Sequence, residues 1–202
     1  MAEVAAVLLA AGASTRFGPG NKLVAHIGAP PLVRCVAETI AASGVAEIVV
    51  VTGADAEVIE RALEGIPVRF AHNARWKSGM GSSIAAGVSA LGEHVDGTFI
   101  VPGDMPLLRP QLLQSLRTAF EREGVLRIVY PATREGAQRN PVLWPRRHFS
   151  LLTALEGQAG AKYLLKRLSD SCTVVTVADE SVFADVDTLG DLAVARARAE
   201  NR

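Results

Sequence analysis

Short runs of apolar, often β-branched residues alternate along this chain with longer stretches whose apolar residues recur at helical spacing. The short runs predict β-strands, because strands that are covered on both faces have continuously apolar sequences. The expected strands are residues 4–9, 47–52, 68–71, 98–102, 127–130, 141–144, 173–177 and a short one at 183–186. The longer stretches predict helices at residues 32–43, 56–64, 82–91, 110–123, 145–155, 161–168 and 189–200.

Strands that alternate with helices predict βαβ units, right-handed crossovers and a mostly parallel sheet. The segment between residues 127–130 and 141–144 has no room for a crossover helix, so this pair is expected to run antiparallel and make the sheet mixed. No internal repeat, linker or low-complexity tract interrupts the pattern. The sequence therefore predicts a single α/β domain over residues 1–202.

Composition narrows the classes of protein that fit. Hydrophobic residues make up 49% of the chain and charged residues 21%, as in ordinary globular proteins. The 21 basic and 21 acidic residues cancel, and a duplex-binding protein normally has a basic surplus, so we expect no nucleic-acid partner. Cys35 and Cys172 lack metal-binding spacing and are expected to be reduced, as in a cytoplasmic protein. The apolar run at residues 4–11 is too short to span a bilayer, and we expect no signal peptide or membrane segment.

In an open α/β sheet, ligands bind beyond the carboxyl ends of the strands, and small residues follow the first expected strand. Residues 9–18 read Leu-Ala-Ala-Gly-Ala-Ser-Thr-Arg-Phe-Gly, and Lys22 comes shortly after them. Small residues allow backbone N–H groups to approach phosphate oxygens, and Arg16 and Lys22 add two positive charges. Neither a Walker A loop nor GxGxxG spacing is present. The alternative is a glycine turn with solvated charges. The predicted nucleotide-binding residues of this loop are Leu9, Ala10, Ala11, Gly12 and Ser14.

Acidic residues follow two other expected strands. Asp104 comes directly after the fourth strand, where it is a candidate ligand for Mg²⁺, an ion that needs only one or two carboxylates beside phosphate oxygens. Alternatively, Asp104 bonds to its own backbone in a turn. Asp187 or Asp185 is a candidate second ligand, and both would face the same side of a strand. Alternatively, Asp187 or Thr188 caps the last helix, with Asp191 in its first turn.

Two further polar segments are candidate binding loops. After the third expected strand come Asn73, Gly79, Ser82 and Ser83, which we expect to contact the base and ribose of a nucleotide. Alternatively, one of these serines caps the next helix. Trp76, between them, is either a lid over the site or a cover for the edge of the core. We expect the loops after the first, third and fourth strands to converge on one crevice.

The segment at residues 134–141 is polar and rich in hydrogen-bond donors. Arg139 and Asn140 are candidate contacts for the phosphate of an acceptor molecule. The alternative is an exposed hairpin loop.

Together these segments resemble the molybdenum cofactor cytidylyltransferases of the MobA-like nucleotidyltransferase superfamily. The residues that carry the resemblance, in family order, are 9–18 with Lys22, His72-Asn73, 79–84, 103–106, Asn140-Pro141, 157–161 and 185–188. The chain departs from the family pattern at Phe17, where a methionine is usual. It departs again at residues 157–162, Gly-Gln-Ala-Gly-Ala-Lys, where the family often has Gly-Asp-x-Gly-Ala-Arg. Ala10-Ala11-Gly12 resembles the cytidylyl branch, since the guanylyl branch tends to carry a second glycine.

The resemblance implies a Rossmann-like three-layer fold with a mixed central sheet, of the nucleotide-diphospho-sugar transferase type. It implies Mg²⁺ held at Asp104 and phosphates held by the first loop, Arg16 and Lys22. We predict Asp187 as the second metal ligand, with Asp185 as the alternative, and Arg16, Lys22 and Asp104 as the catalytic residues. The implied reaction transfers CMP from CTP to the phosphate of molybdopterin cofactor and releases pyrophosphate, with transient contact to a molybdoenzyme or its maturation factor. The alternatives are a related enzyme that uses GTP, a sugar phosphate or phospholactate, and a non-catalytic nucleotide-binding regulator.

Overall fold

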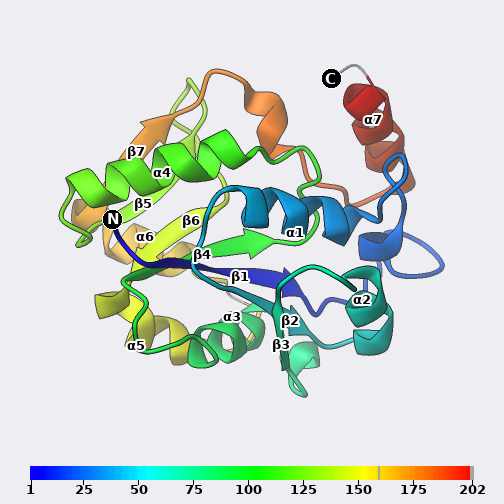
Figure 1. Ribbon diagram of the computed structural model, residues 1–202, viewed down its shortest axis with the longest axis horizontal. Coiled ribbons are helices and arrows are strands. Elements are labelled where there is room, and N and C mark those ends of the chain that lie inside the picture. The colour runs from blue at the N-terminus through cyan, green and yellow to red at the C-terminus, as the bar shows by residue number, and fades with distance from the viewer. Residues whose placement is uncertain (159, 201–202) are drawn as a thin grey trace.

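The computed structural model describes residues 1–158 and 160–200. These residues form a seven-stranded sheet with the strand order β3-β2-β1-β4-β6-β5-β7 (Figure 1). The strands are β1 (Val4–Ala10), β2 (Ile48–Thr52), β3 (Arg69–His72), β4 (Gly97–Pro102), β5 (Ile128–Ala132), β6 (Val142–Pro145) and β7 (Cys172–Thr176). The middle strand of this order, β4, is parallel to its neighbour β1.

The pairing confirms a mixed, mostly parallel sheet. Strand β1 pairs in parallel with β2 and β4, β2 with β3, and β5 with β7. Strand β6 runs antiparallel to both of its neighbours, β4 and β5. The antiparallel pairing expected for residues 127–130 and 141–144 is therefore confirmed, because the short loop between them carries no crossover helix.

Helices cover both faces of the sheet and complete three layers (Figure 1). They are α1 (Leu32–Ala42), α2 (Ala56–Ala62), α3 (Met80–Ser89), α4 (Pro110–Arg122), α5 (Phe149–Thr153), α6 (Lys162–Arg167) and α7 (Leu189–Glu200). One core cluster joins the sheet to α1, α2, α4 and α7, and a second joins its other face to α3, α5 and α6. Every helix among the described residues is too short or too polar to cross a membrane.

Strand β1 shows how the sequence assigns side chains to the two cores. Val4, Ala6 and Leu8 belong to the first cluster, and Val7 belongs to the second. Successive residues of a strand point to opposite faces, so a continuously apolar strand supplies both cores. Helix α3 lies close against this strand, because Gly87 has no side chain to hold the two apart: a Cβ at Gly87 would lie 2.3 Å from Cγ1 of Val7.

Two sequence-based expectations are wrong. Residues 183–186 are not a strand: the 3₁₀ turn η5 (Glu180–Phe183) runs into an extended loop. The N–H of Val186 donates to the carbonyl of Asp104 at 2.9 Å instead of joining a ladder. The helix expected at residues 145–155 begins only at Phe149, after the turn η3 (Arg146–His148). Pro145 ends the buried strand β6, opposite Gly97, and does not start a helix.

Candidate functional site

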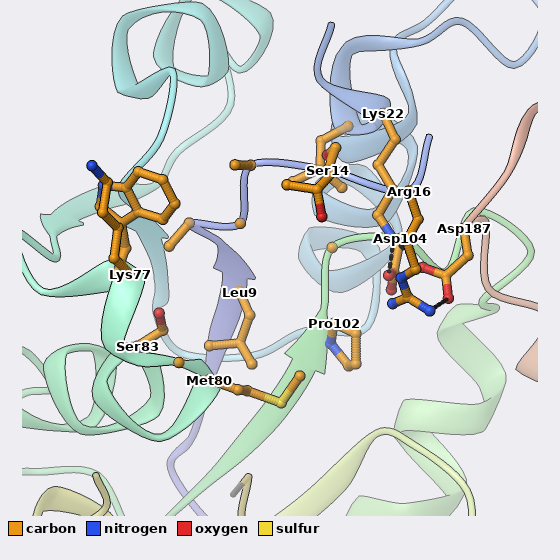
Figure 2. A pocket seen from close by; sticks show the side chains of 18 of the residues that line it. Leu9, Ser14, Arg16, Lys22, Lys77, Met80, Ser83, Pro102, Asp104 and Asp187 are labelled. Atoms are coloured by element: carbon orange, nitrogen blue, oxygen red, sulfur yellow. Dashed lines mark hydrogen bonds and ion pairs between the residues drawn. The ribbon is translucent and has the colours of Figure 1, made fainter. Parts of the chain in front are cut away.

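The loops after β1 and β4 meet at one cavity of about 430 Å³ (Figure 2). Leu9 and Pro102 are register partners at the carboxyl ends of the two strands. The N–H of Gly103 donates to the carbonyl of Leu9 at 3.0 Å, and a Cβ at Gly103 would lie 2.7 Å from that oxygen. Glycine therefore allows the two loops to touch. The loop after β3 also lines the cavity, which confirms the expected convergence of the three segments.

One end of the cavity holds a compact group of charges. The ammonium of Lys22 lies 2.7 Å from Oδ2 of Asp104 and 2.7 Å from Oδ1 of Asp187. Arg16 Nη1 lies 2.8 Å from the other oxygen of Asp187. Burial alone would lower the pKa of Lys22, but the two carboxylates more than offset it and the pKa is raised. Lys22 is therefore a fixed positive charge at the carboxyl ends of β1 and β4.

Asp187 is available for these contacts because its neighbours make the helix-end bonds. The N–H groups of Asp187 and Thr188 donate to Oδ2 of Asp191 at 3.1 and 2.8 Å. The N–H of Asp191 donates in return to the Thr188 hydroxyl at 3.2 Å. Hydrogen bonds from Thr188 and Asp187 hold the pKa of Asp191 below its usual range. Thr188 and Asp191 thus satisfy the start of α7, and the side chain of Asp187 faces the cavity. Asp185 lines a neighbouring cavity and is not its partner on a strand face.

The paired carboxylates suit a divalent metal ion. Oxygens of Asp104 and Asp187 both lie within hydrogen-bond distance of one ammonium, so they converge on a single cation position. Among the described residues, no group of three or more His, Cys, Asp and Glu side chains is placed to hold a metal by itself. Two carboxylates completed by phosphate oxygens and water are what Mg²⁺ requires in proteins. The donor set therefore fits a hard divalent ion that is shared with a phosphate.

Asn73 donates hydrogen bonds to both candidate serines, Ser82 and Ser83, which differ in where their own hydroxyl protons point. Its side-chain amide donates to the hydroxyl oxygens of Ser82 at 2.9 Å and Ser83 at 3.0 Å. Ser82 in turn donates to the carbonyls of Gly79 and Arg75, so its hydroxyl is used within the protein. The hydroxyl proton of Ser83 has no acceptor among the described residues, and Ser83 lines the cavity. Ser83 is therefore the serine that is placed to donate to a ligand.

The other predicted binding residues divide by their exposure to the cavity. Those that line it are Leu9, Ala11, Gly12, Ser14, Gly79 and Ser83. Ala10, Asn73 and Ser82 are buried and do not line it. Their side chains therefore do not face this cavity, and their predicted contacts to the nucleotide stay predictions.

A second cavity, of about 770 Å³, opens beside the first. Leu9, Met80 and Gln158 line both, so the two cavities are contiguous. Arg139 and Asn140 lie in the second cavity, as expected for contacts to an acceptor. The rest of its wall is mixed, with apolar residues such as Ile84, Trp144 and Leu165 beside charged residues such as Lys162, Glu180 and Asp185. Ala159, within the segment at 157–162 that carries part of the resemblance, lies outside the described residues.

Leu23 and Lys77 line the first cavity outside every segment that the sequence singled out, and Met80 lies in the segment at 79–84 but was not named as a contact. Lys77 directly follows Trp76 in the loop after β3, so its position in the chain was the only signal for it. Met80 is half exposed at the first position of α3, where a methionine is usually interpreted as a core residue.

The MobA-like NTP transferase domain matches residues 6–172. The chain belongs to this family. It is 32% identical to the nicotine blue oxidoreductase of Paenarthrobacter nicotinovorans over 200 residues, which cover 92% of this chain and 93% of that one. It is 39% identical to the bifunctional protein GlmU of Chromohalobacter salexigens over 111 residues, which are 54% of this chain and 24% of that one.

Solved structures confirm the fold class. A nucleotidyl transferase from Methanothermobacter superposes with a TM-score of 0.84 at 19% identity and 98% coverage of both chains. CMP:2-keto-3-deoxy-manno-octonic acid synthetase in complex with CTP gives 0.76 at 16% identity and 99% coverage of both. The manganese complex of Rv0371c from Mycobacterium tuberculosis gives 0.72 at 20% identity, with 96% of this chain and 98% of that one covered. The nucleotidyltransferase neighbours share the three-layer architecture of this chain.

Proposed function

We propose that this protein is a magnesium-dependent cytidylyltransferase that transfers CMP from CTP to the phosphate of molybdopterin cofactor and releases pyrophosphate. The observation that carries the proposal is the group of Lys22, Arg16, Asp104 and Asp187 at the junction of two contiguous cavities. Membership of the MobA-like NTP transferase family, one fold neighbour in complex with CTP and another in complex with manganese support it.

Each residue has a role in this reaction that follows from its charge and position. Backbone N–H groups of residues 9–18, with Arg16 and Lys22, hold the triphosphate in the first cavity. Asp104 and Asp187 hold Mg²⁺, which acts as a Lewis acid on the phosphate oxygens when bound. Arg139 and Asn140 bind the acceptor phosphate in the second cavity. Its oxygen forms a bond to the α-phosphorus while the bond from that phosphorus to the pyrophosphate oxygen breaks.

The acceptor needs no general base in this scheme. A phosphomonoester has a second pKa of about 6, so it is mostly dianionic at neutral pH and already nucleophilic. Consistent with this, none of the described residues that line either cavity is a histidine. Rate enhancement then comes from positioning the two phosphates and from neutralising the charge on the leaving pyrophosphate.

The proposed preference for CTP over GTP rests on the wall that Ala11 forms in the first cavity, where we place the base of the nucleotide. Ala11 lines it and leaves less freedom for close backbone approach than glycine would. Gly53 backs this alanine so closely that a Cβ at Gly53 would lie 2.8 Å from the Ala11 carbonyl oxygen. A purine is larger than a pyrimidine, and a closely packed wall that cannot move back excludes the larger ring.

The test is pyrophosphate release with CTP, GTP, ATP and UTP, measured as kcat/KM with Mg²⁺ and molybdopterin cofactor. We expect the highest value for CTP. A clear preference for GTP would refute the cytidylyl assignment and leave the nucleotidyltransferase standing. Release only with a sugar phosphate or phospholactate as acceptor would refute the molybdopterin assignment.

A second candidate function is favoured by the relative that matches over nearly its whole length, which is named an oxidoreductase. In that case the first cavity would bind a dinucleotide that donates a hydride, and the second cavity, which Trp144 and Phe183 help to line, would bind a planar acceptor. Oxidation of a reduced nicotinamide dinucleotide in the presence of a dye, without pyrophosphate release from any triphosphate, would favour this function. Nucleotide binding with neither activity would favour a regulator.

A further inference from the structure

The first cavity has a second end, away from the charged group, where the roles above assign no side chain that contacts the face of the base or its acceptor atoms. Trp76 and Lys77 line it there, in the loop after β3. Figure 2 shows Lys77 across the cavity from Arg16, Asp104 and Asp187, with Leu9 and Met80 between them and Ser83 on the same side as Lys77. A nucleotide whose phosphates lie at the charged end therefore extends toward Trp76 and Lys77.

The backbone of Trp76 is held in place from several sides. Its N–H donates to the carbonyl of Asn73 at 3.1 Å, and its own carbonyl accepts from Gly79 at 3.2 Å. Behind it, Gly53 lies so close that a Cβ there would be 2.7 Å from Cβ of Trp76. Trp76 is half-buried, and it is the only aromatic residue among the described residues that line this cavity. A half-buried tryptophan with a fixed backbone loses little freedom when a flat group stacks on it.

Lys77 places a positive charge over the indole ring of Trp76. Its ammonium lies 5.4 Å from the ring centroid of Trp76. Among the described residues, no carboxylate forms an ion pair with it, so its N–H donors are available to a ligand. The hydroxyl of Ser83 is a further donor on the same cavity wall.

We propose that Trp76 is the stacking platform for the nucleobase and that Lys77, with Ser83, donates hydrogen bonds to its acceptor atoms. The proposal rests on the proposed nucleotide-binding function of this cavity. Aromatic side chains bind bases through their π-faces whatever the sequence, so stacking supplies affinity and the donors supply selectivity. Two donors match cytosine, in which O2 and N3 are adjacent acceptors. Uracil carries a hydrogen on N3, which would meet a donor and is therefore disfavoured.

Tryptophan fluorescence tests the platform directly, because the chain has only two tryptophans, Trp76 and Trp144. The wild-type protein, Trp76→Phe and Trp144→Phe are titrated with CTP and with inorganic tripolyphosphate in the presence of Mg²⁺. We expect CTP, but not tripolyphosphate, to quench the wild-type protein and Trp144→Phe. Trp76→Phe should bind CTP by calorimetry without quenching. Equal quenching in Trp76→Phe would overturn the proposal.

Affinity separates a stacking role from a structural one. Trp76→Ala should weaken CTP binding on the order of tenfold and leave tripolyphosphate binding unchanged, because only CTP has a base to stack. An equal loss for both ligands would mean that Trp76 merely supports the loop, and would overturn the platform. Lys77→Met should reduce the ratio of CTP to UTP affinity, and an unchanged ratio would overturn its role as a donor.

These readouts measure binding, so they are independent of group transfer. Quenching by CTP without pyrophosphate release would refute the transferase function and still support the stacking platform. Pyrophosphate release by the wild-type protein, with CTP affinity unchanged in Trp76→Ala, would refute the stacking platform and support the transferase.

Discussion

Replacing Lys22 with methionine removes the one charge that joins Asp104 to Asp187, and the structure indicates what this does to stability. Both ion pairs are 2.7 Å long, and the Lys22 side chain is 13% exposed. Exposed ion pairs contribute about 0–1 kcal/mol, and breaking a buried pair by removing one partner costs about 3–5 kcal/mol. Lys22 lies between these limits, so we expect Lys22→Met to lose about 2 kcal/mol of unfolding free energy when no divalent metal is present.

In a domain of this size, 1 kcal/mol shifts the midpoint of thermal unfolding by about 2–4 °C, so the expected fall in Tm is about 4–8 °C. The pKa of Lys22 is raised above its ordinary value of 10.5, and the group is charged at all lower pH values. Its contribution is therefore fully present at neutral pH and is lost only as the pH rises through the folded-state pKa.

A divalent ion should reverse this loss, because it takes the position that the ammonium vacates between the two carboxylates. We therefore expect Lys22→Met to bind Mn²⁺ more tightly than the wild-type protein in the absence of nucleotide. At 100 times the Kd, the ion would restore about 2.7 kcal/mol. Thermal unfolding with EDTA and with increasing Mn²⁺, together with calorimetric Kd values, measures both effects. Lys77→Met is the matched control, since Lys77 lines the same cavity and forms no ion pair with a carboxylate among the described residues. Equal Mn²⁺ affinity in Lys22→Met and the wild-type protein would refute the reasoning.

Three other substitutions test the site and the fold. Asp104→Asn should reduce pyrophosphate release on the order of 10³-fold or more while the protein stays folded, because a metal ligand is lost, and near-normal turnover would contradict the metal assignment. The carboxylate of Glu47 accepts a hydrogen bond from the Gly92 N–H at 2.8 Å and forms an ion pair with Arg69 at 2.6 Å. Burial alone would raise the pKa of Glu47, but these two contacts lower it below its ordinary value of 4.5. A carboxylate whose pKa is lower in the folded than in the unfolded state stabilises the fold at pH values above its unfolded-state pKa. This stabilisation is lost as the pH falls through its folded-state pKa. Glu47→Gln should therefore be less stable than wild type by about 1 kcal/mol in denaturant titrations at pH 7, with a difference that shrinks as the pH falls below 4.5 and through the folded-state pKa. Gly87→Ala should destabilise by about 1–3 kcal/mol despite the better helix propensity of alanine, because its Cβ would lie 2.3 Å from Val7; an equal or higher midpoint would show that α3 moves freely.

The fold and the charged end of the site were predictable because they depend on local sequence and on simple topology. Continuously apolar strands such as β1 and β2 are visible as runs, and their parallel pairing follows from the helices between them. Since β1 and β4 are adjacent and parallel, the loop with Lys22 and the turn with Asp104 necessarily meet. The alternation along β1 also explains why Ala11 lines the cavity while Ala10 is buried in the first core cluster, a distinction that the period-two pattern already contained.

The rest of the site depends on contacts between distant segments. Asp187 was a candidate ligand on the sequence, but its position depends on the bond from Val186 to the Asp104 carbonyl, and the sequence pattern suggested a strand there instead. Ser82 and Ser83 are equivalent in sequence terms. Only the position of Asn73 shows that one hydroxyl is used internally while the other faces the cavity.

The paired carboxylates also separate the two candidate reactions in chemical terms. An oxidoreductase that binds a dinucleotide needs a phosphate-binding loop and a surface for the base, which are the two roles proposed for this cavity. Hydride transfer does not need two carboxylates that converge on one cation. Phosphoryl chemistry does, because a metal ion must offset the charge that builds up on the leaving pyrophosphate. Nearby anions are unfavourable for a site that only binds phosphates, so the meeting of Asp104 and Asp187 around Lys22 is explained more simply by nucleotidyl transfer. If the oxidoreductase candidate were correct, Asp104→Asn and Asp187→Asn would leave redox turnover intact or raise it, whereas the transferase would lose its activity.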